Sequence, residues 1–120
     1  MTGLFVYGTL KEGYYNYRRV EALITRVSRG WHVVGGLYDL GPYPALDFSG
    51  RQTVTGELLE SDRLDELLRV TDEIEGDEYE RVEVEAIGED GSRRRAWTYR
   101  YAGDTAHLPR LIAGEWNGTC

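Results

Sequence analysis

Cysteine is nearly absent from this sequence of 120 residues, and the only one is Cys120 at the very end. A lone thiol cannot form an internal disulfide, and we expect no prenylation box, in which cysteine stands fourth from the end. Histidine is almost as scarce. His32 and His107 are the only two, and they lie far apart in the sequence without ligand-like neighbours. We therefore predict no metal site and no Cys–His catalytic pair.

Positive charge is also in short supply. The chain has 14 Lys and Arg against 21 Asp and Glu, and its net charge is -7. Nucleic acids and anionic membrane surfaces both require a basic face, so we expect neither as a partner. No apolar run is long enough to span a membrane, and the N-terminus lacks the pattern of a signal peptide. These absences predict a cytoplasmic protein, and they do not indicate an oligomeric state.

What remains is the composition of a globular protein, with 41% hydrophobic and 12% aromatic residues. The length predicts one domain over residues 1–120, large enough to bury a core without disulfides or a structural metal. Nine tyrosines outnumber two phenylalanines, so most of the aromatic surface carries hydroxyl groups. Such a surface suits a pocket for a polar ligand.

The stretch Phe5-Val6-Tyr7-Gly8-Thr9-Leu10 organises the N-terminal part of the chain. Its apolar start predicts a buried strand over residues 3–7, which Gly8 ends. A glycine there lets the backbone approach a ligand, and successive N–H groups can bind an anion such as a carboxylate. A plain strand–turn junction is the alternative. A P-loop is excluded because Tyr14-Tyr15 replaces the required Lys-Ser/Thr, and no G-x-G-x-x-G pattern predicts a dinucleotide cofactor.

Further elements of both types follow in one short chain. The expected elements are a helix within residues 14–27, a strand at 31–40 kinked at Gly35-Gly36, a turn at 47–51, a strand at 52–59, a helix from Ser61 or Asp62, and hairpin strands at 82–86 and 96–101. The Pro42-Tyr43-Pro44 loop, which follows the strand at 31–40, is stiff and presents one aromatic ring; a rigid connector without a binding role is the alternative. This mixture predicts an α+β fold in which five or six strands form a small mixed barrel.

One carboxylate lies on the apolar face of the second predicted helix. At 3.6 residues per turn, Glu75 falls on the same stripe as Leu64 and Leu68, whereas Glu73 points nearly the opposite way. Gly76 then ends the helix. Desolvation on that stripe would raise the pKa of Glu75 toward the range useful for proton transfer. The alternative is a helix that frays before Glu75, whose side chain then turns to water.

Four motifs follow one another along the chain. They are Val6-Tyr7-Gly8-Thr9-Leu10-Lys11 with Gly13 and Asn16, Leu37-Tyr38-Asp39-Leu40-Gly41 with Tyr43-Pro44-Ala45, Thr55-Gly56-Glu57-Leu58, and Asp72-Glu73-Ile74-Glu75-Gly76 with Tyr79 and Arg81. In this order they resemble the motifs of the gamma-glutamylcyclotransferase-like superfamily, most closely those of its small bacterial members and the gamma-glutamylamine cyclotransferases. The resemblance runs from about residue 4 to residue 101. Thr71 stands where leucine is usual, and Tyr14-Tyr15 replaces a glycine-rich segment.

The resemblance implies a mixed barrel with flanking helices and an enzyme that needs no metal or cofactor. Such an enzyme cyclises a gamma-glutamyl group to 5-oxoproline and releases an amine. By position, Tyr7, Gly8, Thr9 and Leu10 would bind the glutamyl group, and Glu75 would serve as general base and then as acid. The leaving amine stays open: it could belong to a peptide, a polyamine, lysine or a biosynthetic intermediate.

Two other functions remain as alternatives. The first is a non-catalytic module of the same fold that binds a small acidic metabolite. A binder has no need of a buried base, so Glu75 favours the enzyme. The second is an interaction domain whose strand face of Trp97, Tyr99 and Tyr101 meets a protein partner, although a place in the core also explains these residues.

Overall fold

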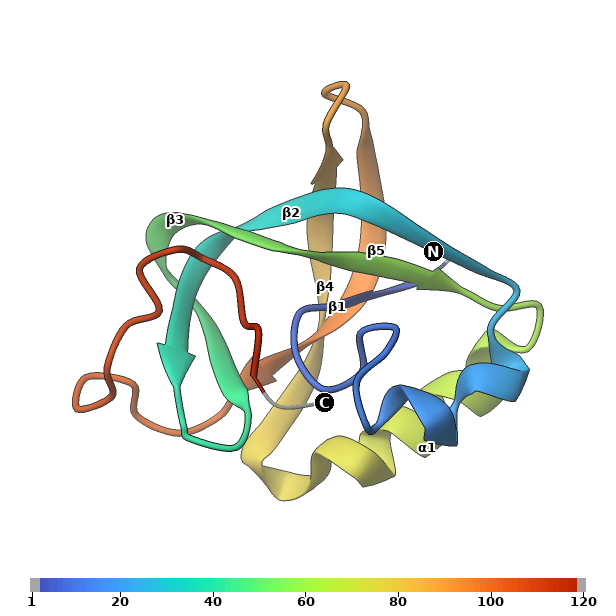
Figure 1. Ribbon diagram of the computed structural model, residues 1–120, viewed down its shortest axis with the longest axis horizontal. Helices are drawn as coiled ribbons and strands as arrows, with labels where there is room; N and C mark the ends of the chain where they lie inside the picture. Colours follow the sequence, from blue (N-terminus) through green and yellow to red (C-terminus); the bar gives the residue numbers. More distant parts are fainter. Residues whose placement is uncertain (1–2, 119–120) are drawn as a thin grey trace.

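The computed structural model describes residues 3–118 and shows a closed five-stranded barrel flanked by one α-helix (Figure 1). The strand order around the barrel is β1-β3-β2-β4-β5. β1 pairs in parallel with β5, and the other pairs are antiparallel. The predicted α+β fold with a small mixed barrel is confirmed. The elements are β1 (Gly3–Val6), β2 (Arg26–Asp39), β3 (Pro44–Glu60), α1 (Leu64–Glu75), β4 (Tyr79–Gly88) and β5 (Arg93–Tyr101).

β1 is apolar at every position because both of its faces are buried. Phe5 points into the barrel interior, where it packs with Leu58 of β3. Leu4 and Val6 point outward and pack in a second apolar cluster with Leu67 of α1. A strand that is buried on both faces shows a continuous hydrophobic run rather than alternation. The barrel wall thus separates two cores, and β1 contributes to both.

β5 shows the same division, and it explains the aromatic face predicted there. Ala96 and Thr98 are fully buried, whereas Tyr99 belongs to the outer cluster beneath α1. Trp97 packs against that outer cluster, and Tyr101 meets the ring of Tyr79 edge-on. The helix therefore covers much of this aromatic face, which is not an open patch for a partner.

The helix predicted within residues 14–27 is wrong. Two short 3₁₀ turns stand in its place, η1 (Tyr17–Arg19) and η2 (Glu21–Leu23), and β2 already begins at Arg26. Tyr17 and Val20 are both buried, and their three-residue spacing suits a 3₁₀ turn. The amide of Thr25 then donates to the carbonyl of Glu60 at 2.8 Å, so the chain pairs with the end of β3 as soon as the second turn ends.

The predicted turn at residues 47–51 is also wrong, since these residues lie within β3. Gly35 pairs with Gln52 while Gly36 pairs with Asp47, so residues 48–51 bulge out of the ladder. The irregularity between Gly35 and Gly36 confirms the kink predicted there. A side chain at Gly35 would clash with the carbonyl of Asp47, which explains the glycine at this position.

α1 starts later than predicted but ends where the sequence indicates. The Ser61 hydroxyl accepts a hydrogen bond from the amide of Arg63 at 2.9 Å, and the first helical residue is Leu64. Gly76 follows the last helical residue with a φ of +67°, a conformation that other residues rarely adopt. A 3₁₀ turn, η3 (Gly76–Glu78), then leads into β4.

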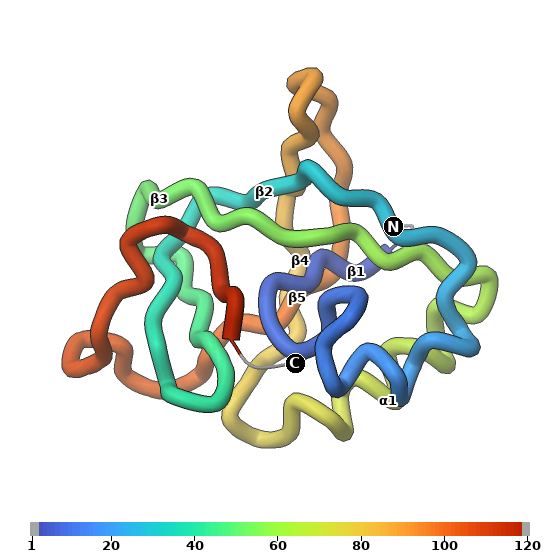
Figure 2. The backbone as a smooth tube through the Cα atoms, viewed as in Figure 1, coloured from blue at the N-terminus to red at the C-terminus, as the bar shows by residue number. Residues whose placement is uncertain are grey.

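The chain after β5 folds back across β2 and β3, as the red end of the tube in Figure 2 shows. The amide of Leu111 donates to the carbonyl of Leu37, and Trp116 is buried in the barrel core. Cys120 lies outside the described residues. No helix within residues 3–118 is long and apolar enough to cross a membrane.

Candidate active site

A pocket opens where β1 ends, between the segment that follows this strand and the last turn of α1. We call residues 7–10 the N-terminal loop; its segment of the chain is blue in Figure 1. The pocket has a volume of about 310 Å³ including its open mouth, and its lining includes the whole loop together with Glu75. The structure thus brings together all five predicted site residues: Tyr7, Gly8, Thr9, Leu10 and Glu75.

The N-terminal loop leaves its backbone donors available. The carbonyl of Gly8 accepts from Lys11, and the carbonyl of Thr9 accepts from Asn16. The Asn16 side chain also donates to the Thr9 hydroxyl at 2.9 Å, which fixes the loop from a second direction. Within residues 3–118, no turn or loop hydrogen bond uses the N–H of Gly8, Thr9 or Leu10 as its donor. A fixed run of free N–H groups suits an anion such as a carboxylate.

Gly8 is needed for close packing rather than for an unusual backbone angle. Its φ is not among the positive values found at other glycines. A Cβ at Gly8 would instead lie 2.8 Å from the ring carbons of Pro44. Pro44, the first residue of β3, therefore packs directly against the N-terminal loop, and both line the pocket.

Glu75 is the last residue of α1, and its side chain is half-buried. Desolvation raises the pKa of Glu75 to about 7. Among the described residues, no ion pair or side-chain hydrogen bond involves its carboxylate. A carboxyl group with this pKa exists in both protonation states near neutral pH, so it can accept a proton and return it.

Two tyrosine hydroxyls in the lining donate their protons to the main chain. Tyr7 donates to the carbonyl of Tyr99 and Tyr79 to the carbonyl of Pro44, both at 2.6 Å. Burial raises the pKa of Tyr7 and of Tyr79, and the negative charge of Glu75 adds to both shifts. Both hydroxyls therefore stay protonated. A backbone hydrogen bond from Leu46 reaches the Tyr7 hydroxyl, whereas the Tyr79 oxygen remains as an acceptor for a donor such as an ammonium group.

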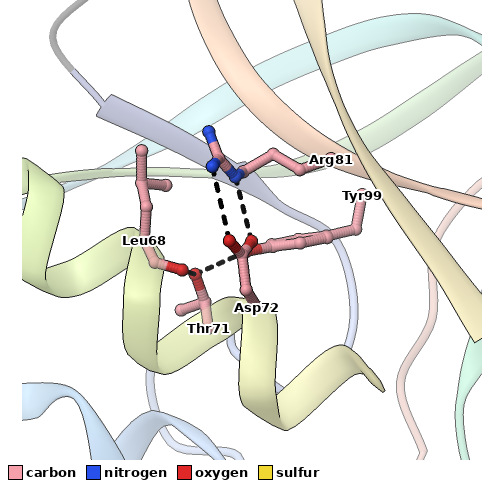
Figure 3. Close-up of polar contacts among 5 residues, drawn as sticks. All are labelled: Leu68, Thr71, Asp72, Arg81 and Tyr99. Atoms are coloured by element: carbon pink, nitrogen blue, oxygen red, sulfur yellow. Dashed lines mark hydrogen bonds and ion pairs between the residues drawn. The ribbon is translucent and has the colours of Figure 1, made fainter. Parts of the chain in front are cut away.

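A polar network holds the last turn of α1 against the barrel (Figure 3). Asp72 accepts from the Tyr99 hydroxyl at 2.6 Å and from Nε of Arg81 at 2.9 Å. The Tyr99 hydroxyl also lies 2.6 Å from the hydroxyl of Thr71. Burial alone would raise the pKa of Asp72, but the hydrogen bonds from Arg81 and Tyr99 outweigh it and lower that pKa. Arg81 does not line the pocket; it binds the helix that carries Glu75.

Residues 4–118 match the protein family described as "Gamma-glutamyl cyclotransferase, AIG2-like". The chain belongs to this family. It is 37% identical over 113 residues to the gamma-L-glutamyl-butirosin B gamma-glutamyl cyclotransferase of Niallia circulans, a match that covers 87% of this chain and 69% of the relative.

Solved structures share the fold. An AIG2-like protein from Mus musculus superposes with a TM-score of 0.73 at 25% identity, covering 98% of this chain and 88% of the mouse chain. YkqA from Bacillus subtilis gives a TM-score of 0.75 at 22% identity, covering 96% of this chain but only 39% of YkqA. Within residues 3–118, no group of three or more His, Cys, Asp or Glu is placed to hold a metal ion.

Sequence reasoning about this cyclotransferase-family chain missed several residues that line the pocket. Tyr43 and Pro44 line the pocket, and the stiff Pro42-Tyr43-Pro44 loop was the feature of the sequence that could have indicated this. Tyr79 lies four residues after Glu75, in the same motif. Tyr99 had no usable signal, because its alternation with Trp97 and Tyr101 shows a shared face but not what that face meets.

Proposed function

We propose that this member of the family is a gamma-glutamyl cyclotransferase that converts a gamma-glutamyl amine or peptide into 5-oxoproline and a free amine. The observation that carries the proposal is the meeting of Glu75, which has a raised pKa, with the free N–H groups of the N-terminal loop in one pocket. The name of the Niallia circulans relative supports it, since that protein acts on a gamma-L-glutamyl compound.

In this proposal, the two charged groups of the glutamyl moiety have separate partners. The N–H groups of Gly8, Thr9 and Leu10 bind the α-carboxylate. The α-ammonium group meets acceptors only: the hydroxyl oxygen of Tyr79, whose proton is donated to Pro44, and the carboxylate of Glu75. The apolar side chains in the lining surround the methylene groups.

The reaction itself requires one proton acceptor and one donor. Glu75 takes a proton from the α-ammonium, and the resulting amine attacks the γ-carbonyl carbon. Glu75 then returns this proton to the amide nitrogen as its bond to that carbon breaks. The ring nitrogen still carries an extra proton after the attack; Glu75 passes it to the released amine, which leaves as an ammonium ion. Because the attack is intramolecular, holding the substrate in a folded conformation can lower the barrier by roughly 7–11 kcal/mol. Neither a metal nor a cofactor enters these steps.

The test is a panel of gamma-glutamyl peptides and amines, assayed for 5-oxoproline release with and without EDTA. We expect release from at least one compound and no loss of rate with the chelator. Tight binding of gamma-glutamyl compounds without any release would instead favour the non-catalytic binding module. A rate that EDTA abolishes and zinc restores would contradict the proposed mechanism.

A further inference from the structure

A second cavity adjoins the candidate active site and shares Glu75 with it. Its volume is about 360 Å³ including its open mouth, and four residues line both cavities: Thr9, Tyr43, Glu75 and Tyr79. Beyond these, its lining consists of Tyr15, Asn16, Ile74 and Glu78. We call it the distal cavity. The carboxylate that would protonate the leaving nitrogen therefore lies at the junction of the two spaces.

This junction determines where the leaving amine can lie. The glutamyl half of the substrate occupies the pocket beside the N-terminal loop in the function proposed above. The scissile amide nitrogen must lie next to Glu75 to receive its proton. The remainder of the amine then extends past Glu75, and the distal cavity is the space that continues from there.

The charges in the distal cavity have one sign. Of the described residues that line it, Glu75 and Glu78 carry carboxylates, and none is Lys, Arg or His. Glu78 is exposed, and one hydrogen bond orients its carboxylate: its Oε1 accepts from the Tyr43 hydroxyl at 3.0 Å. Its main-chain carbonyl accepts from the amide of Ala102 at 2.8 Å, which fixes the backbone at this position. An oriented carboxylate favours a cation and repels an anion.

Aromatic rings complete the cavity. Tyr15 is 48% exposed although it is a large aromatic residue, and Tyr43 lies near Tyr79 with 6.4 Å between ring centroids. The faces of such rings attract an ammonium group. Acidic and aromatic side chains without a cation match a positively charged ligand and no other charge type.

We propose that the distal cavity is the subsite for the leaving amine, and that it selects amines bearing a second positive charge, such as a diamine or polyamine chain. This inference rests on the proposed cyclotransferase function and deepens it. Glu78 is the residue that determines the preference. An amine that carries a carboxylate near the scissile bond is disfavoured by the same group.

The test compares three gamma-glutamyl amides of equal chain length whose leaving amines end in an ammonium, a methyl or a carboxylate group. We expect kcat/KM to be highest for the ammonium compound, by about 5-fold over the methyl compound, which corresponds to a partly screened ion pair. Glu78→Gln keeps an acceptor for Tyr43 but removes the charge, so it should abolish this preference. Glu73→Gln removes one charge of the same sign from an exposed position on α1 and should retain the preference.

A second measurement separates this inference from the proposed function. Glutaric monoamides with the same three amines lack the α-amine and cannot cyclise, so calorimetry reports their binding to the wild-type protein without turnover. If no amide yields 5-oxoproline but the ammonium monoamide binds about 5-fold tighter in a Glu78-dependent way, the proposed function fails and the subsite stands. Equal binding of the three monoamides, no binding of any, or a preference that survives in Glu78→Gln overturns the inference.

Discussion

Asp72 and Glu75 lie three residues apart on α1, yet their surroundings give them opposite chemistry. Asp72 is 44% exposed and accepts from both Arg81 and Tyr99, so its pKa is lowered. Glu75 lies in the pocket without such partners, and desolvation raises its pKa to about 7. The two side chains leave the helix only about 60° apart, so helix geometry alone does not create the contrast.

The difference comes from how one tyrosine and one arginine are placed. Tyr99 lines the candidate active site, and its hydroxyl binds Asp72 at the edge of that site. Arg81 is committed to Asp72 and stacks on the ring of Trp97, 4.6 Å from its centroid. A cation beside Glu75 would stabilise its ionised form and lower its pKa. The ion pair with Asp72 thus anchors the helix and also keeps that cation away from Glu75.

The largest expected effect on activity comes from removing the ability of Glu75 to exchange a proton. Glu75→Gln preserves the size of the side chain and its capacity for hydrogen bonds, so folding and glutamyl binding should persist. We expect kcat to fall by at least ~10²-fold, the lower end for general acid–base catalysis. Steady-state rates of 5-oxoproline release, together with calorimetry of substrate binding, measure the two effects separately.

Glu73→Gln is the matched control, because Glu73 is exposed on the same helix and neither described cavity includes it. It should leave kcat unchanged. Normal turnover by Glu75→Gln, or an inactive Glu73→Gln, would show that the catalytic assignment is wrong.

The pH dependence of kcat/KM distinguishes Glu75 from Asp72 through a smaller effect. Catalysis requires the ionised form of Glu75, whose pKa is about 7. The ionised fraction, and with it kcat/KM, should rise by about 10-fold between pH 6 and pH 8. Asp72 is already ionised throughout that range because its pKa is lowered from 3.8, so Asp72→Asn should retain the same profile. An acidic limb near pH 4.5 would mean that Glu75 is not desolvated.

The sequence predicts the position of Glu75 well, but it does not predict the partners of Asp72. The position of Glu75 follows from local information: helical phase from Leu68 onward and a glycine that ends the helix. The N-terminal loop is also local, because a fully apolar strand runs directly into Gly8. Both features depend on residues close together in the chain, where periodicity and turn chemistry are informative.

The partners of Asp72 are not local. Tyr99 is 27 residues away, and Arg81 reaches Asp72 from a different element. The pairing depends on how β5 and α1 meet across the outer core, which no short motif determines. The prediction of a helix within residues 14–27 failed for a related reason. Their spacing suits an α-helix, but early pairing with β3 leaves room only for two 3₁₀ turns.

The smallest expected effect is that of Asp72→Asn, which removes the charge but leaves an acceptor for the Tyr99 hydroxyl. Because Asp72 and Arg81 are partly exposed, we expect a loss of about 1 kcal/mol in unfolding free energy at pH 7, the upper end for such pairs. The lowered pKa means that Asp72 stabilises the fold above pH 4 and that this contribution disappears as the pH falls through its folded pKa. The difference between wild type and variant should therefore shrink in urea titrations below pH 4. Turnover should fall only a few-fold, since Tyr99 loses its charged partner but Glu75 retains its place. A variant as inactive as Glu75→Gln would show that the two carboxylates act as one unit.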